Sequence, residues 1–228
     1  MSAGPKKVPE SPSGSSRSPL RVLIVDDHAV MRDGLKQMLA KKFSDATFGE
    51  ASNAQGALEL LDSATWDVML LDLAMPGRGG LEVLSQLKDI QPTTKTIVLT
   101  MHSIDQYAVR VLKLGASGYL TKESASDEVI AAVEKVLTGG KYVTTALAEK
   151  LMSELGTASD KKPHELLSDR EYQVLLQLAS GKTVKEIGTE LSLSMKTIST
   201  YRTRIFKKLK FKSNADVVRY GISEKLVK

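Results

Sequence analysis

The chain has 228 residues, enough for one large domain or two ordinary ones, because domains cluster around ~100–150 residues. Hydrophobic residues make up 42% and charged residues 26%, as in a soluble globular protein, and no apolar stretch approaches the ~20 residues of a membrane-spanning helix. Cysteine is absent, which excludes disulfides, thiol nucleophiles and thiolate zinc sites. The N-terminus lacks the apolar core of a secretory signal, and we expect a cytoplasmic protein.

The net charge of +5 is distributed unevenly along the chain. Residues 164–228 hold 13 Lys and Arg against 7 Asp and Glu, whereas residues 20–163 hold 16 against 19. A basic end behind a mildly acidic body suggests that the end of the chain meets a polyanion. A solvated, lysine-rich surface explains the same charge, so the charge alone leaves both interpretations open.

The first 19 residues are rich in Pro, Ser and Gly and carry almost nothing to bury, so we expect them to be disordered. After them, short apolar runs alternate with segments whose apolar residues recur at helical spacing. The last of these helical segments begins near Ser126, a plausible N-cap. The pattern predicts strands over 21–27, 46–52, 66–73, 95–101 and 117–122, and helices over 28–42, 54–63, 79–90, 104–115 and 126–140.

Five strands alternating with five helices predict a doubly wound α/β domain with a parallel sheet, although the pattern does not give the strand order. In such sheets, ligands bind outside the carboxyl ends of the strands. The pattern changes after Gly140: a helix is predicted over 144–155, a polar linker over 156–165, and only helices follow from Leu166 onward. The boundary between the two domains therefore falls within residues 142–165.

Polar residues gather at the predicted carboxyl ends of the strands. Asp26 and Asp27 follow the first strand, Asp72 the third, Thr100 the fourth and Lys122 the fifth. Three converging carboxylates with one lysine would repel one another unless a cation were present, and Mg²⁺ prefers such oxygen ligands. Asp72 is then a candidate nucleophile, because carboxylates can form acyl-phosphate intermediates.

Each of these residues has an ordinary alternative explanation. Asp27 could cap the following helix, Asp72 could cap a loop, Thr100 could be a plain strand residue, and Lys122 could be a surface charge. The joint occurrence of all of them at the ends of four strands is what favours a phosphoryl-transfer site.

The motifs "VDDH", "LLDLAMPGRGGLEVL", "VLTMHS" and "GYLTK" make residues 20–141 resemble the receiver domain of two-component response regulators. The resemblance implies a flavodoxin-like, five-stranded parallel sheet and a phosphoryl group accepted by Asp72 from a histidine kinase. It also implies that Mg²⁺ is held by Asp27, Asp72 and the backbone carbonyl of Ala74, with Asp26 acting mainly through water.

Thr100, Tyr119 and Lys122 match the family's switch threonine, switch aromatic and lysine. Once Asp72 is phosphorylated, Thr100 is expected to bond the phosphoryl oxygen and vacate space for Tyr119, a local charge event that biases a two-state element. Without the resemblance, Tyr119 reads as a plain half-buried strand aromatic.

The basic end of the chain predicts four helices. Ser168 with Glu171 forms one expected capping box, and Thr183 is expected to cap the next helix, with Glu186 three residues on. A short helix, the tight turn 192–194 and a longer polar, basic helix over 195–209 describe a helix-turn-helix.

This part resembles the LuxR/NarL-type DNA-binding domain through "LSDRE", "KEI", "LSLSMKTISTYRTRIFKKL" and "KSNADVVRYGI". Ser199, Thr200 and Thr203 are expected nearest to base edges, whereas basic residues would contact phosphates. The family commonly has His where this chain has Tyr201 and Gly where it has Lys210. The complete set of expected DNA contacts is Lys196, Thr197, Ser199, Thr200, Arg202, Thr203, Arg204, Lys207 and Lys208.

These observations predict a response regulator of the NarL/FixJ type, with residues 20–141 as receiver, 142–165 as linker and 166–228 as DNA-binding domain. The expected partners are a sensor histidine kinase, double-stranded promoter DNA, a second copy of the chain and RNA polymerase. Without phosphate, the receiver is expected to mask the recognition helix. Two rivals are a Mg²⁺-dependent phosphohydrolase, which would lack its second acid because Ala74 stands there, and a phosphorylation-independent DNA binder.

Overall fold

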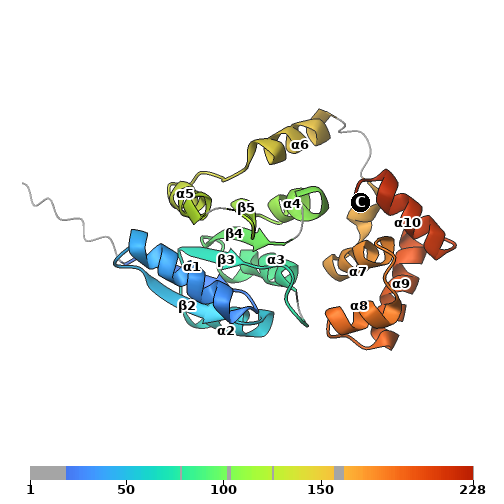
Figure 1. Cartoon of the computed structure of the whole chain (residues 1–228), viewed down its shortest axis with the longest axis horizontal. Helices are drawn as coiled ribbons and strands as arrows, with labels where there is room; N and C mark the ends of the chain where they lie inside the picture. Colours follow the sequence, from blue (N-terminus) through green and yellow to red (C-terminus); the bar gives the residue numbers. More distant parts are fainter. Residues whose placement is uncertain (1–18, 78, 102–103, 125, 157–161, 228) are drawn as a thin grey trace, which may run out of the picture.

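The structure, a computed structural model, describes residues 19–227 apart from 78, 102–103, 125 and 157–161. The disorder expected for the first 19 residues falls almost entirely outside the described residues. The chain folds into an α/β unit followed by a helical unit (Figure 1). The five strands pair in parallel in the order β2-β1-β3-β4-β5, which is the flavodoxin-like order and confirms the expected class. The strands are β1 (Arg21–Val25), β2 (Thr47–Ala51), β3 (Val68–Leu71), β4 (Lys95–Thr100) and β5 (Gly118–Thr121).

Helices cover both faces of the sheet, which is why β3 is buried along its whole length. Alternate strand residues face two separate cores: Leu23 and Met69 face α2, α3 and α4, whereas Val22 and Val68 face α1 and α5. The helices are α1 (Ala29–Lys42), α2 (Ala54–Ser63), α3 (Gly80–Ile90), α4 (Ile104–Lys113) and α5 (Ser126–Leu137). Ser126 is the first helical residue of α5, whereas an N-cap residue directly precedes the first helical residue. The prediction that Ser126 is the N-cap is therefore wrong.

After α5 the described residues form the helices expected over 144–155 and from Leu166 onward, and also a 3₁₀ turn that begins within the segment expected to be a polar linker. This part of the chain consists of α6 (Thr145–Gly156), the 3₁₀ turn η1 (Pro163–Leu166), α7 (Asp169–Ala179), α8 (Val184–Glu190), α9 (Met195–Leu209) and α10 (Asn214–Ser223). Within the described part of the chain, no helix is long and apolar enough to cross a membrane.

Side-chain caps define the starts of α7 and α8. The capping boxes of Ser168 with Glu171 and of Thr183 with Glu186 are both present, which confirms the expected helix starts. Lys210 ends α9 in the left-handed region, at φ 57, where glycine carries no penalty and lysine does.

Candidate functional sites

The carboxyl edge of the sheet brings together the polar residues expected there. Asp26 follows β1 and Asp72 follows β3, and each is only 2% exposed. Lys122, which follows β5, lies between them, with its Nζ 2.6 Å from Asp26 Oδ2 and 2.7 Å from Asp72 Oδ2. One ammonium group therefore bridges two buried carboxylates, which rules out the plain surface charge considered for Lys122.

The ammonium of Lys122 is kept charged by its neighbours. Burial by itself lowers the pKa of Lys122, because it penalises the charged form. The hydrogen bonds and negative charges of Asp26 and Asp72 outweigh burial, and the net result is a raised pKa. The site thus holds a permanent cation beside Asp72 at neutral pH.

Asp27 adds a third carboxylate to this edge. Its Oδ1 is buried without a hydrogen-bond partner; His28 Nδ1 approaches it to 3.0 Å without hydrogen-bond geometry. Asp26, Asp27, His28 and Asp72 each place a ligand atom within 4.8 Å of the others. An unsatisfied buried carboxylate oxygen beside two further carboxylates fits a hard divalent cation, whose charge would offset their repulsion. His28 was not anticipated from the sequence, because a histidine after an Asp pair carries no distinctive pattern.

The alternative explanations of the acids are only partly supported. Helix α1 has His28 as its N-cap, so Asp27 does not cap it and that alternative is wrong. Asp72 does close its loop, because its Oδ1 accepts a hydrogen bond of 3.1 Å from the backbone N–H of Ala74. Asp72 therefore has a local structural bond through one oxygen and an ion pair with Lys122 through the other.

The two expected switch residues are fully buried beside this site. Thr100, the last residue of β4, is 0% exposed and Tyr119 in β5 is 1% exposed, so Tyr119 is not the half-buried aromatic of the alternative reading. Burial raises the pKa of Tyr119, and the nearby Tyr172 and Asp72 raise it further. Tyr119 is thus close enough to interact with Asp72 in one domain and with α7 in the other.

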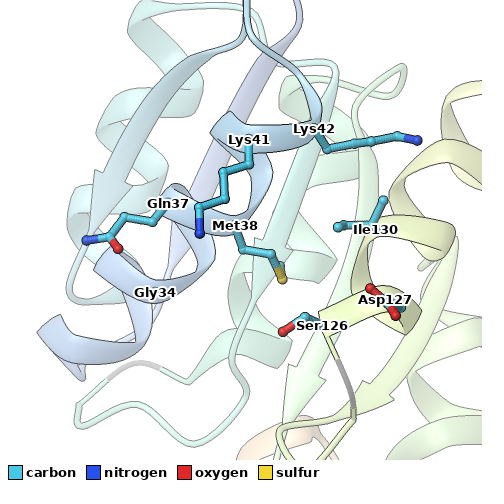
Figure 2. A pocket seen from close by; sticks show the side chains of 8 residues that line it. All are labelled: Gly34, Gln37, Met38, Lys41, Lys42, Ser126, Asp127 and Ile130. Atoms are coloured by element: carbon cyan, nitrogen blue, oxygen red, sulfur yellow. The ribbon is translucent and has the colours of Figure 1, made fainter.

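A separate hollow of about 450 Å³ lies between α1 and α5. Figure 2 shows Met38 and Ile130 in this hollow, with Lys41, Lys42 and Asp127 around it. None of Asp26, Asp27, Asp72 and Lys122, which together form the acidic edge of the sheet, lines the hollow. The two lysines of the hollow make it unsuited to a cation. The hollow is therefore separate from the carboxyl edge of the sheet.

The expected DNA-contacting residues lie along α9. Its N-cap is Ser194, whose hydroxyl accepts a hydrogen bond from the backbone N–H of Thr197 at 3.1 Å, so Thr197 takes part in capping. The hydroxyls of Thr200 and Thr203 donate to backbone carbonyls one turn earlier, at 2.9 and 3.0 Å. The side chains of Lys196, Ser199, Thr200, Thr203, Arg204, Lys207 and Lys208 are exposed.

Two of the expected contacts are held by partners inside the domain. Arg202 Nε donates to Asn214 Oδ1 at 3.0 Å, and its guanidinium lies 4.7 Å from the centroid of the Phe206 ring. Lys208 Nζ lies 2.6 Å from Oε2 of Glu171, a carboxylate with 3% of its side chain exposed. The sequence pattern placed both on an outward face and could not show that each side chain folds back onto a neighbouring helix.

Two family models match the two units. The response regulator receiver domain matches residues 22–134, and the luxR family of bacterial regulatory proteins matches residues 165–221. The chain belongs to the NarL/FixJ family of response regulators. This regulator is accordingly a phosphorylation-controlled, DNA-binding regulator of transcription.

The regulator is similar to relatives over nearly their whole length. It is 34% identical to the response regulator UvrY of Escherichia coli K12 over 204 residues, which cover 89% of this chain and 94% of that protein. It is 36% identical to the response regulator GacA of Pseudomonas aeruginosa PAO1 over 208 residues, covering 89% and 97%. RcsB from Salmonella enterica serovar Typhimurium, solved bound to promoter P1flhDC with the phosphomimetic BeF3⁻, matches with a TM-score of 0.59 and 25% identity, covering 89% and 98%.

Proposed function

We propose that Asp72 accepts a phosphoryl group from a sensor histidine kinase in the cytoplasm. The observation that carries this proposal is the position of the Asp72 carboxylate, 2.7 Å from a raised-pKa lysine and beside the unsatisfied Oδ1 of Asp27. We propose residues 20–141 as the receiver, 142–165 as the linker and 166–228 as the DNA-binding domain.

The transfer is a displacement at phosphorus. A carboxylate oxygen of Asp72 attacks the phosphorus of a phosphohistidine, the O–P bond forms as the N–P bond breaks, and the electron pair returns to the imidazole, which takes up a proton. Lys122 neutralises charge on the phosphoryl oxygens, and Thr100 then donates its hydroxyl to one of them. Asp26, Asp27, Asp72 and the carbonyl of Ala74 would hold Mg²⁺, which supplies further charge neutralisation when bound.

We further propose that the regulator binds promoter DNA as a homodimer, because symmetric operators match two-fold protein symmetry. The exposed Ser199, Thr200 and Thr203 would lie nearest to the bases, while Lys196, Arg204 and Lys207 would contact phosphates. RNA polymerase is proposed as a further partner at the promoter.

A mass measurement combined with a DNA-binding assay tests this function. Acetyl phosphate with Mg²⁺ is expected to add the mass of one phosphoryl group to the wild type and none to Asp72→Asn. Binding to genomic fragments at fixed salt should respond to acetyl phosphate in the wild type only. The absence of a mass gain in the wild type would contradict the proposal.

We propose that the regulator is not a phosphohydrolase. The position two residues after Asp72 is Ala74, which cannot act as the second acid that such enzymes use to protonate a leaving group. Sustained turnover of a small phosphomonoester by the purified protein would refute this. DNA binding that is identical in Asp72→Asn, with and without the phosphodonor, would instead favour a phosphorylation-independent DNA binder.

A further inference from the structure

The exposed start of α9 carries an apolar side chain that the expected DNA contacts do not include. Met195, the first residue of this helix, is 60% exposed. Lys196 follows it, and Ser199, one turn further along, is exposed as well. The N-terminal residues of a recognition helix are those that reach base edges in the major groove. Met195 therefore lies among the side chains that would face the bases.

Two threonines of the exposed face have their hydroxyl protons bound within the helix itself. Thr200 Oγ1 donates to the carbonyl of Lys196 at 2.9 Å, and Thr203 Oγ1 donates to the carbonyl of Ser199 at 3.0 Å. Such a bond turns one substituent of the branched Cβ to the backbone and so fixes the rotamer. Toward a base edge, each threonine then offers a methyl group and an oxygen lone pair but no proton.

Side chains that read bases through paired hydrogen bonds are scarce on α9. Adenine is read by Asn or Gln, cytosine by Asp or Glu, and guanine by Arg or Lys. The sequence of α9 contains no Asn, Gln, Asp or Glu. Of its two arginines, Arg202 is held by Asn214 and the Phe206 ring, and Arg204 is a proposed phosphate contact. Methyl groups are therefore a large part of what the outer face of α9 presents to bases.

These side chains are accessible in the intact chain. Met195, Thr200 and Thr203 are exposed, as is Ser199. The receiver contacts α7 instead, where Arg110 Nη2 lies 2.7 Å from Asp169 Oδ1, and Figure 1 shows α7 on the side of the helical unit that faces the sheet. The expectation that the receiver masks the recognition helix is therefore wrong for these side chains.

We propose that α9 reads thymine by apolar contact, with the methyl groups of Met195, Thr200 and Thr203 packed against thymine C5-methyl groups in the major groove. This inference deepens the proposed binding to promoter DNA and rests on it. The C5-methyl group is what an apolar side chain recognises on thymine. The contact is stabilised by removing apolar surface from water, so it needs no hydrogen bond to the base. Each half-site then carries thymine where the start of α9 enters the groove.

Replacing thymine by uracil tests this contact, because uracil pairs with adenine in the same way and lacks only the C5-methyl group. A genomic fragment that the full-length wild type retains after treatment with acetyl phosphate and Mg²⁺ is amplified with dTTP or with dUTP, from primers outside the bound region. Both duplexes are titrated at one fixed salt concentration. The ratio of the two dissociation constants is the thymine preference.

The protein variants remove the same contact from the other side. Met195→Ala removes the thioether chain, and Thr200→Ser and Thr203→Ser remove a methyl group but keep a hydroxyl that can donate to the backbone. Met152→Ala is the matched control, because this side chain is 72% exposed and lies in α6, outside the DNA-binding domain. Lys207→Met removes a proposed phosphate contact and serves as the control for general loss of affinity.

The wild type is expected to bind the uracil fragment roughly fifteenfold more weakly, because burying one methyl group changes a binding constant about fourfold and a dimer makes the contact twice. Met195→Ala, Thr200→Ser and Thr203→Ser should each weaken binding to the thymine fragment and reduce the thymine preference. Thr200→Val, which keeps the methyl group and loses the hydroxyl, should retain more of the preference than Thr200→Ser. Met152→Ala should keep the wild-type preference, and Lys207→Met should weaken binding to both fragments by the same factor.

The contrary outcomes separate this inference from the proposed function. Equal affinity for the two fragments, in a wild type that gains the phosphoryl mass and binds DNA, overturns the thymine contact and leaves the proposed function standing. Failure of that protein to bind any genomic fragment overturns both. A uracil effect of the same size in the wild type, Met195→Ala and both serine variants arises from the DNA alone, and it also overturns the inference.

Discussion

Lys207 and Lys208 are neighbours on α9, and both are expected phosphate contacts, yet the structure gives them different surroundings. Lys208 Nζ is 2.6 Å from Glu171 Oε2, and the same oxygen accepts the backbone N–H of Ser168 at 2.8 Å, which closes the capping box of α7. Lys207 is exposed and forms an ion pair with no described residue. We therefore predict opposite phenotypes for Lys208→Met and Lys207→Met.

Lys208→Met removes one charge-assisted hydrogen bond from a carboxylate with 3% of its side chain exposed, which costs about 2 kcal/mol of unfolding free energy. In a domain of this size, that loss lowers the melting temperature by roughly 10 °C. Lys207→Met should stay within about 0.5 kcal/mol of the wild type. DNA binding should show the opposite pattern, with the larger effect in Lys207→Met. This substitution should reduce the salt slope, which is the slope of the logarithm of the binding constant against the logarithm of the salt concentration, by about 0.9 per protomer. Lys208→Met should leave the salt slope unchanged.

Hydrogen exchange of peptides from α7 and α9 measures the stability of the DNA-binding domain, because the single tryptophan, Trp66, lies in the receiver. The salt slope comes from titrating one genomic fragment at several salt concentrations. If Lys208→Met lowers the slope as much as Lys207→Met and leaves exchange unchanged, the reasoning from the Glu171 pair is refuted.

Three further predictions concern buried groups. Lys122→Met leaves the buried carboxylates of Asp26 and Asp72 without their cation, so the free energy of unfolding of the receiver should fall by about 3 kcal/mol. Urea unfolding followed by tryptophan fluorescence measures this loss, and Mg²⁺ should restore part of it. An unchanged free energy of unfolding would contradict the buried ion pairs of Lys122. Burial is the main cause, and the charge of Lys162 the second, of a pKa of His164 that is lowered to about 4. An NMR titration should therefore show a neutral imidazole as the pH is lowered to about 4. Since unfolded histidine titrates near 6.5, this group's contribution to stability is present above 6.5 and is lost as the pH falls toward 4. Gly221→Ala would place a Cβ 2.6 Å from the methyl group of Ala179 in α7 and should lower the free energy of unfolding by about 1–3 kcal/mol. Gly34→Ala, which has open space around it, should instead raise the free energy of unfolding by up to about 1 kcal/mol. Thermal melts of the two variants test this contrast.

The acidic edge shows how far local pattern reaches. A short apolar run closed by Pro and Gly, such as β3, is typical of a strand buried on both faces, and parallel strands bring their carboxyl ends to one edge. Asp26, Asp72 and Lys122 could therefore be placed together in advance. The capping boxes were equally accessible, because their hydrogen bonds join residues only three positions apart.

Contacts between residues that are distant in the chain could not be predicted from local pattern. The pairing of Lys208 with Glu171 and of Arg110 with Asp169 depends on how helices cross, and helical periodicity gives the direction of a side chain but not the surface opposite it. The exposure of Ser199 and Thr203 in the docked chain depends on the placement of whole domains, which the linker leaves open. The sequence by itself determined the fold class, the acidic edge and the helix-turn-helix, because each arises from local periodicity and spacing. Only the tertiary structure decided which charges are internal, which face solvent, and how the receiver holds its DNA-binding domain.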